Sequence, residues 1–451
     1  MAVLLAVCAL AAACSDSAEV TFSTRSVVPP ETPGGDAAGP GESVAGGFLP
    51  GGGGPGGSTA TGPGGSTSGR NRTGDGPGGD DGPGGVVKLG TILPLQGGER
   101  ALGEPVLRTT QAFADEVNAR GGINGRRLQV VAYHACIVCQ GEALQAARRL
   151  VEQDRVFALV NTYPMVVAFQ SVIPYLTEKG VPLIQGGAVN QTSEALSPTT
   201  FVTSPGGRWY ARFLSAVVAE RAQAPAVGIV FLNVNNESRL LPILRHELQA
   251  RGIEVTAEER IEAAEEAVTN MDSVVAKIRA TGAQGVVAMN PAVLIFGRLA
   301  ARRQQWHVPW TGPAAWTDLV EEGCGATCDE IVFTDTAGLS YIDRDSPQMR
   351  EFHDTMRRRY PDGQHTGHTL AAWVGMQLFV HVLAQLPAPD QPAFVAAMER
   401  IRNLDLGTTG PITFGPDRHM GGSRSVVLQL REGKFFRASD PLDFGESSYR
   451  G

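Results

Sequence analysis

Short apolar runs alternate with amphipathic stretches through most of the chain, starting at Val86–Leu95, which reads "VVKLGTILPL". In the segment that follows, apolar or small side chains recur at helical spacing at Val106, Thr110, Phe113 and Val117. The sequence "NARGGING" ends this helix, because glycines and an Asn-Gly turn favour a left-handed stop. The runs "RRLQVVAY", "VFALV" and "VPLI" then read as strands between further helical patterns. Strands that alternate with helices predict parallel βαβ units.

The alternation resumes after about residue 204. Strand-like runs are "AVGIVFL", "IEVTAEE" and "GVVAM", and helical patterns cover about 208–222, 237–251, 268–281 and 292–303. A mainly helical part over 346–402 follows, and the chain closes with "GPITF" and "SVVLQLREGKFFR", which read as strands. Two sets of βα units over about 365 residues predict two lobes, since a single core of that size is uncommon. We therefore expect an α/β protein with two lobes built from parallel βαβ units.

The first 85 residues break this pattern. Residues 1–13 read "MAVLLAVCALAAA", which is apolar but shorter than the roughly 20 residues that span a bilayer. The stretch is typical of the apolar region of a secretion signal. Residues 15–85 are dominated by Gly, Pro, Ser and Thr, a composition that cannot bury a core, and we expect a disordered tether there.

Composition narrows the functional classes further. The chain has 451 residues, a formal charge of −8 and a hydrophobic fraction of 42%, as expected for a soluble globular protein. A nucleic-acid partner is not expected, because such proteins carry a basic footprint. The sequence of the body shows no GxSxG, phosphate-binding glycine loop or paired catalytic carboxylates, so we predict neither an enzyme nor a bound cofactor or metal.

The stretch that ends the apolar leader, Ala11-Ala12-Ala13-Cys14, resembles the lipobox of bacterial lipoproteins. In that family the signal is cut before the cysteine and the thiol is lipidated, which implies that residues 1–14 provide a signal and a membrane anchor at Cys14. The match departs from the pattern in two ways: Ala11 stands where Leu is preferred, and no Lys or Arg precedes the apolar run. The alternative is a plain secretion signal in which Cys14 has no role, and both readings predict export.

The body of the chain resembles a known family. The blocks "VKLGTILPLQG", "EVNARGGINGRRLQVV", "AARRLVEQDRVFALVN" and "YLTEKGVPLIQGGAVN" follow one another as in type I extracellular solute-binding proteins, in particular the leucine/isoleucine/valine-binding branch that serves ABC importers. The closing "GTTGPITFGPDRHM" is similar to that family's last strand and turn. The resemblance covers roughly residues 86–440 and implies a periplasmic-binding-protein-like I fold. Such a fold has two Rossmann-like lobes with parallel sheets, which are joined by a three-crossover hinge and close over a ligand.

This resemblance assigns parts of the chain to the two lobes. Residues 86–204 would form the first part of lobe 1, 205–340 lobe 2, 341–405 the return to lobe 1, and 406–451 the hinge and C-terminal strands.

The family places its ligand in the cleft between the lobes, near strand ends and helix N-termini. The resemblance implies that the ligand contacts Tyr163, Pro164, Met165, Gly187, Ala188, Val189, Tyr210, Asn236, Asn290 and Trp316. Two departures stand out. Val189 replaces the family's threonine, whose hydroxyl holds a carboxylate, and no acid lies within Gly312–Trp316, where the family pairs the ligand's ammonium.

These departures bear on the ligand and on the partners. An unpaired ammonium in a closed cleft is costly, so we expect a neutral, aromatic or amide-like ligand in place of a free branched-chain amino acid. The functional expectation is a receptor, anchored to the outer face of the cell membrane by lipid, that delivers this ligand to ABC permease subunits. The alternative is a sensor of the same fold that signals to a partner protein without a permease.

The cysteines outside the leader number four: Cys136, Cys139, Cys324 and Cys328. Cysteines of exported proteins usually pair, and the family sometimes has a cystine in the loop "YHACIVCQ", so we predict the disulfides Cys136–Cys139 and Cys324–Cys328. Two alternatives remain open for this loop. A zinc site of His134, Cys136 and Cys139 lacks a clear fourth ligand. A redox pair fits the following helix but not a thioredoxin-like context.

Overall fold

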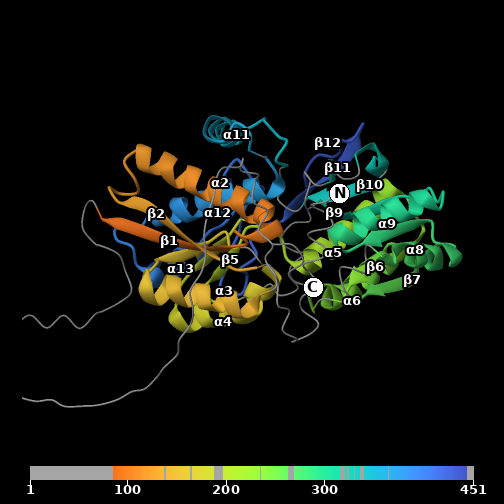
Figure 1. Ribbon diagram of the computed structural model, residues 1–451, viewed down its shortest axis with the longest axis horizontal. Helices are drawn as coiled ribbons and strands as arrows, with labels where there is room; N and C mark the ends of the chain where they lie inside the picture. The colour runs from red at the N-terminus through yellow and green to blue at the C-terminus, as the bar shows by residue number, and fades with distance from the viewer. Residues whose placement is uncertain are drawn as a thin grey trace, which may run out of the picture. The chain divides into compact units, whose positions relative to one another are not determined.

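The computed structural model describes residues 85–136, 139–162, 165–186, 197–233, 235–262, 269–314, 320–321, 325–329, 331–335, 340–363 and 365–443. Within these ranges the chain forms two sheets, each covered by helices (Figure 1). No helix among the described residues is long and apolar enough to cross a membrane. Residues 1–84, which include the predicted signal, Cys14 and the tether, lie outside the described ranges.

The first sheet is entirely parallel, with strand order β2-β1-β3-β4-β5. Its strands are β1 (Val86–Leu93), β2 (Arg127–His134), β3 (Ala158–Val160), β4 (Leu183–Gln185) and β5 (Thr200–Val202). The helical segments between them are η2 (Gly97–Glu99), α2 (Arg100–Ala119), α3 (Gln140–Arg148), η3 (Arg149–Gln153) and α4 (Met165–Lys179). β3, β4 and β5 are short and fully buried, as expected of strands covered on both faces, whereas the edge strand β2 is mostly half-buried and carries polar side chains.

Helices from distant parts of the chain complete this half. They are α11 (Pro347–Arg359), α12 (Gly367–Leu383) and α13 (Gln391–Glu399). One face of the sheet packs Val87 and Phe157 against Phe379 of α12 and Phe394 of α13, while α3 and α4 cover the opposite face (Figure 1). Close packing at the end of β4 requires Gly186, because a Cβ there would lie 1.5 Å from the Ala371 carbonyl oxygen of α12.

The second sheet runs in the order β12-β11-β10-β9-β8-β6-β7, and β13 pairs with β11. Its strands are β6 (Ala226–Leu232), β7 (Glu254–Ile261), β8 (Gly285–Ala288), β9 (Trp310–Pro313), β10 (Ile331–Asp335), β11 (Arg424–Arg431), β12 (Lys434–Arg437) and β13 (Leu442–Asp443). The helical segments are α5 (Gly207–Val217), η4 (Val218–Ala222), α6 (Asn235–Ala250), α8 (Met271–Ala280), α9 (Pro291–Arg303) and η5 (Gly325–Cys328). Helices α5 and α6 share one apolar core, and α8 and α9 share another.

The predicted α/β class with two parallel-sheet lobes is confirmed, with two corrections. The second sheet is mixed, because β11 runs antiparallel to β10 and pairs with the antiparallel β12. The run "GPITF" is not a strand: Ile412 makes a single bridge to Leu404. Pro411 precedes that bridge and has no N–H with which to extend a ladder.

The chain passes three times between the two halves: after β5, before α11 and before β11. The first and third passages lie side by side, since Gly421 N–H donates to the Val202 carbonyl at 2.8 Å. The second passage is tied to β12 by an ion pair of 3.1 Å between Asp343 and Arg437. These contacts hold the first and third crossing segments next to each other, and the second crossing segment next to the second sheet.

Candidate functional site

Each sheet has a point at which the chain changes direction along the strand order. In the first sheet, β1 leads to β2 on one side and β3 leads to β4 on the other, so the loops after β1 and β3 diverge. In the second sheet, β6 leads to β7 and β8 to β9, so the loops after β6 and β8 diverge. In open α/β sheets, ligands bind outside the carboxyl ends of the strands at such switch points.

Asn161 and Thr162 occupy the first switch point, directly after β3. Asn161 has a left-handed backbone, with φ of 49°, and its Nδ2 donates to Thr110 Oγ1 at 3.1 Å and to the Ala372 carbonyl at 2.8 Å. Thr91 of β1 donates to the Asn161 carbonyl at 3.2 Å, which joins the ends of the two diverging strands. This network fixes the direction in which the chain leaves β3.

The Thr162 side chain is 2% exposed, and its hydroxyl has no hydrogen-bond partner among the described residues. A buried polar atom without a partner is rare and costly, so this hydroxyl is suited to a polar group that a ligand brings. The sequence-based list of site residues began one position later, at Tyr163. The available signal was a small hydroxyl residue directly after a buried strand.

Glu237 and Asn290 occupy the second switch point. The Glu237 carboxyl, on the first turn of α6, accepts from Asn290 Nδ2 at 3.0 Å and from Leu232 N–H at 2.7 Å. Asn290 is the N-cap of α9, and its Oδ1 accepts from Ala292 N–H at 2.9 Å. These hydrogen bonds tie the end of β6 and the starts of α6 and α9 together, and they occupy both ends of the Asn290 amide.

The electrostatics of Glu237 follow from its position. Its side chain is 1% exposed, and burial raises the pKa of this carboxyl to about 7, although the hydrogen bonds from Asn290 and Leu232 act in the opposite direction. Both groups that donate to Glu237, the Asn290 side-chain amide and the Leu232 backbone N–H, are neutral. No ion pair involving Glu237 occurs among the described residues. Sequence reasoning missed Glu237, because an acid in the first turn of a helix is ordinarily exposed.

Tyr210, a predicted site residue on α5, is 2% exposed and lies within a hydrogen-bonded chain. Its hydroxyl lies 3.0 Å from Thr334 Oγ1, which itself donates to the Gly312 carbonyl at 3.0 Å. Burial raises the pKa of Tyr210 above its ordinary value, so its proton is retained. The chain links α5 to the carboxyl ends of β9 and β10.

Several predicted site residues cannot be placed against these groups. Outside the described ranges, or without described side chains, are Tyr163, Pro164, Met165, Gly187, Ala188, Val189, Asn236 and Trp316. A cavity of about 240 Å³ lies elsewhere, between the first turns of α2 and the C-terminal end of α11, and is lined by Glu104, Arg108 and Tyr360 among others. None of the predicted site residues lines it.

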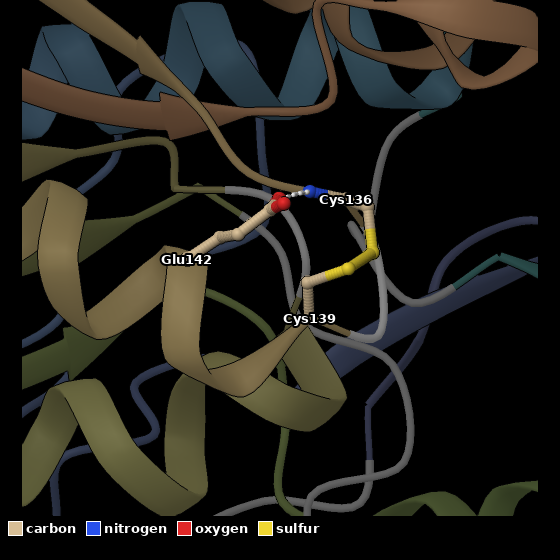
Figure 2. A group of neighbouring side chains, drawn as sticks. All are labelled: Cys136, Cys139 and Glu142. Carbon is tan, nitrogen blue, oxygen red and sulfur yellow. Dashed lines mark hydrogen bonds between the residues drawn. A yellow bond between two sulfur atoms is a disulfide. The ribbon is translucent and has the colours of Figure 1, made fainter. Parts of the chain in front are cut away.

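The cysteine loop follows β2, at the same end of the first sheet. A disulfide joins Cys136 and Cys139, which is the first of the three alternatives for this loop (Figure 2). Cys328 is also disulfide-bonded, while Cys324 lies outside the described residues. Glu142 Oε2 accepts from Cys136 N–H at 3.2 Å, so the first turn of α3 holds the loop.

Comparisons with known proteins agree with this architecture. Residues 86–434 match the family model described as periplasmic binding protein. Leu/Ile/Val-binding protein homolog 7 of Brucella suis biovar 1 is 22% identical over 379 residues, which cover 77% of this chain and 90% of the relative.

Two solved structures show the same fold. The branched-chain amino acid transporter substrate-binding protein of Streptococcus pneumoniae, in complex with isoleucine, has a TM-score of 0.67 at 19% identity and covers 79% of this chain and 99% of its own. An ABC transporter solute-binding protein of R. palustris, in complex with 4-hydroxybenzoate, has a TM-score of 0.67 at 16% identity and covers 79% and 97%. The ligands of these two proteins differ although their TM-scores to this chain are equal.

Proposed function

Since the chain belongs to the periplasmic binding protein family, we propose that it is an extracytoplasmic receptor that captures a small organic molecule between its lobes for ABC import. The matching family and the similar solved proteins are binding proteins, which supports a binding role and no catalytic one. The transporter role is supported by the names of the similar solved proteins, which are components of ABC or amino acid transporters.

The observation that carries this proposal is the pair of switch points, each with buried polar groups at the carboxyl ends of its strands. From the first lobe, Thr162 offers a hydroxyl that has no partner in the described part of the chain. Glu237 and Asn290 form a hydrogen-bonded pair at the second. A cleft that closes over a ligand would bring such groups to it from both sides.

The ligand class follows from the departures in the cleft sequence. The Val189 side chain has no hydroxyl to donate to a carboxylate, and Gly312–Trp316 contains no acid for an ammonium. Glu237 is a nearby acid, but both of its oxygens already accept hydrogen bonds and its burial favours the neutral form. We therefore favour a neutral, aromatic or amide-like ligand, with Tyr163 or Trp316 as stacking partners.

Calorimetry with leucine, isoleucine and valine tests the ligand class. A zwitterion with both charges poorly paired loses about 3 kcal/mol or more, which weakens binding more than about 100-fold. We expect these amino acids to bind no better than millimolar. Micromolar binding would contradict the proposed neutral, aromatic or amide-like ligand class. If Glu237→Gln then lost this binding, Glu237 would be identified as the partner of the ammonium.

A thermal-shift screen of the chain without residues 1–85 identifies the ligand itself. Every described apolar core lies outside that deleted segment, so the remainder contains the elements of both lobes. A compound at about 100 times its Kd stabilises the fold by about 2.7 kcal/mol. Hits confined to neutral aromatic or amide compounds support the proposal, and a screen in which no small molecule raises the melting temperature contradicts the receptor function.

The attachment to the membrane is the last part of the proposal. We infer that lipid on Cys14 and the Gly-rich segment 15–85 tether the receptor outside the cytoplasm, next to its permease. The support is the lipobox-like Ala11–Cys14 and the composition of the segment that follows it.

A further inference from the structure

The first turn of α3 gathers two sulfur atoms and a carboxylate in a small volume. The Sγ atoms of Cys136 and Cys139 and a carboxylate oxygen of Glu142 all lie within 4.8 Å of one another (Figure 2). Cys139 is the N-cap of α3, and Glu142 follows it by three residues. Thiolates three positions apart in a Cys-x-x-Cys pair, together with a carboxylate, make a donor set that Zn²⁺ accepts.

His134 lies beside this carboxylate. Its Nδ1 accepts the Leu95 N–H at 3.0 Å, so the proton of the neutral ring is on Nε2. Nε2 lies 4.0 Å from Glu142 Oε2, on the same side as the loop. The lone pair of the neutral ring is already used by the Leu95 N–H, so His134 is not a fourth ligand.

We propose that this loop is a redox-gated metal site, in which reduction of the Cys136–Cys139 disulfide frees two thiolates that bind Zn²⁺ together with Glu142. The fourth position belongs to water, as in zinc sites with three protein ligands. The disulfide and the zinc site are then two states of one loop. This inference is independent of the proposed receptor function.

The redox step needs a dithiol as co-reactant. Its thiolate attacks one cysteine sulfur, the Sγ–Sγ bond breaks, and a mixed disulfide forms. The second thiol of the reductant then displaces the protein thiolate, so that the dithiol becomes a disulfide while the protein gains two electrons and two protons. Zn²⁺ binding releases the thiol protons, and the N-terminus of α3 favours the thiolate of Cys139.

Cys136 and Cys139 are more exposed than Cys328, the other described cysteine. Cys136 and Cys139 are half-buried, and the Glu142 side chain is 53% exposed, so a reductant and a hydrated cation can reach the loop. Cys328 is disulfide-bonded but 0% exposed. The chain therefore contains its own control for the accessibility of a disulfide.

The test measures zinc binding by the full-length protein before and after reduction with a phosphine, with a chromophoric chelator as competitor. We expect one additional Zn²⁺ per chain in the reduced wild type, none in the oxidised protein, and none at this site in Cys136→Ser/Cys139→Ser, which retains Cys324 and Cys328. Glu142→Gln should weaken the affinity about 10- to 100-fold. Equal zinc binding by oxidised and reduced protein, or by the double variant, overturns the proposal.

The exclusion of His134 from the ligand set is tested by substitution. His134→Ala should leave the zinc affinity of the reduced protein unchanged within about twofold, because its ring is not a ligand. A loss of about tenfold or more would show that the ring binds the metal and would contradict this ligand set. Thermal unfolding of each oxidised variant verifies that it folds.

Discussion

Thr162 and Glu237 are buried polar side chains whose hydrogen-bond requirements are met to different degrees. The Thr162 hydroxyl has no partner among the described residues, whereas each Glu237 oxygen accepts from one neutral donor. Binding sites often hold such groups, because a ligand supplies what the fold leaves out. The effect of each buried group on the free energy of unfolding can be measured without the ligand.

The first prediction concerns Thr162→Val, which replaces the hydroxyl by a methyl group of similar shape. Since an unpaired buried hydroxyl contributes nothing favourable, the free energy of unfolding without ligand should stay constant or rise by up to about 1 kcal/mol. Thr91→Val is the matched control, because the Thr91 hydroxyl donates to the Asn161 carbonyl at 3.2 Å and is fully buried. The free energy of unfolding of Thr91→Val, measured by denaturant titration, should fall by about 1 kcal/mol. A larger loss in Thr162→Val than in Thr91→Val would contradict this assignment.

The second prediction concerns pH. Burial raises the pKa of Glu237 from 4.5 to about 7 on folding, so the fold favours the neutral acid. The preference of the folded state for protonated Glu237 contributes to the free energy of unfolding. This contribution is complete below pH 4.5, falls as the pH rises, and is lost above pH 7. A pKa shift of this size corresponds to a change of about 3 kcal/mol in the free energy of unfolding across this pH range.

Glu237→Gln removes this titration. Its free energy of unfolding should lack the decline between pH 4.5 and 7 that the wild type shows, although one amide hydrogen would face a donor and lower stability by about 1 kcal/mol throughout. Denaturant titrations at several pH values make the comparison. An unchanged slope in the variant would show that another group causes the decline.

Sequence reasoning reached the site at this scale only in part. Asn290 stands at the second switch point, and its contact with a ligand, which the resemblance implies, stays a prediction. Glu237 and Thr162 were missed because their burial depends on which strands are neighbours, and the strand order is not encoded in local periodicity. The order β6-β8 places Asn290 against Glu237, although 53 residues separate them in the chain.

At the scale of elements, the packing of α12 on the end of β4 depends on small residues. A Cβ on Gly186 would lie 1.5 Å from the Ala371 carbonyl oxygen, a contact that only a movement of the backbone could relieve. Local sequence predicted both elements but not their contact, because 185 positions of chain separate them.

The third prediction follows from this contact. Gly186→Ala should lower the free energy of unfolding by about 3 kcal/mol or more, since overpacking against backbone cannot be relieved by a rotamer change. Gly141→Ala is the matched control: it lies in α3 with nothing within 4 Å of an added Cβ. It should be neutral or stabilise by up to about 1 kcal/mol. Chemical denaturation compares the two, and equal stability would refute the close contact.

Element boundaries were predicted well where periodicity was strong. The pattern of Val106, Thr110 and Val117 corresponds to α2, and the strand runs correspond to β1 through β4. The predicted helical part 346–402 is divided into α11, α12 and α13. The errors fall in the closing region, where a proline-containing run mimics a strand and antiparallel pairing replaces the expected parallel one.

At the scale of the whole molecule, the fourth prediction concerns attachment. If lipid on Cys14 anchors the receptor, Cys14→Ala should move it from the membrane fraction to the soluble fraction, because a lipid chain supplies about 0.8 kcal/mol of membrane affinity per buried methylene. Immunoblots of fractionated cells measure the distribution, with Cys8→Ala as the control that keeps Cys14. Membrane association of Cys14→Ala that still requires detergent would contradict the lipobox interpretation.

The contact between Phe157 and Phe394, whose ring centroids are 5.6 Å apart, has a consequence for biosynthesis. More than half of the chain's length separates these residues, and at about 5–20 residues per second a ribosome needs on the order of tens of seconds to add it. During that time β1 through β5 exist without α12 and α13, so their apolar side chains lack the partners that bury them. We expect the emerging polypeptide to remain unfolded, and hence able to thread through a secretion channel, until nearly all of it has been translated.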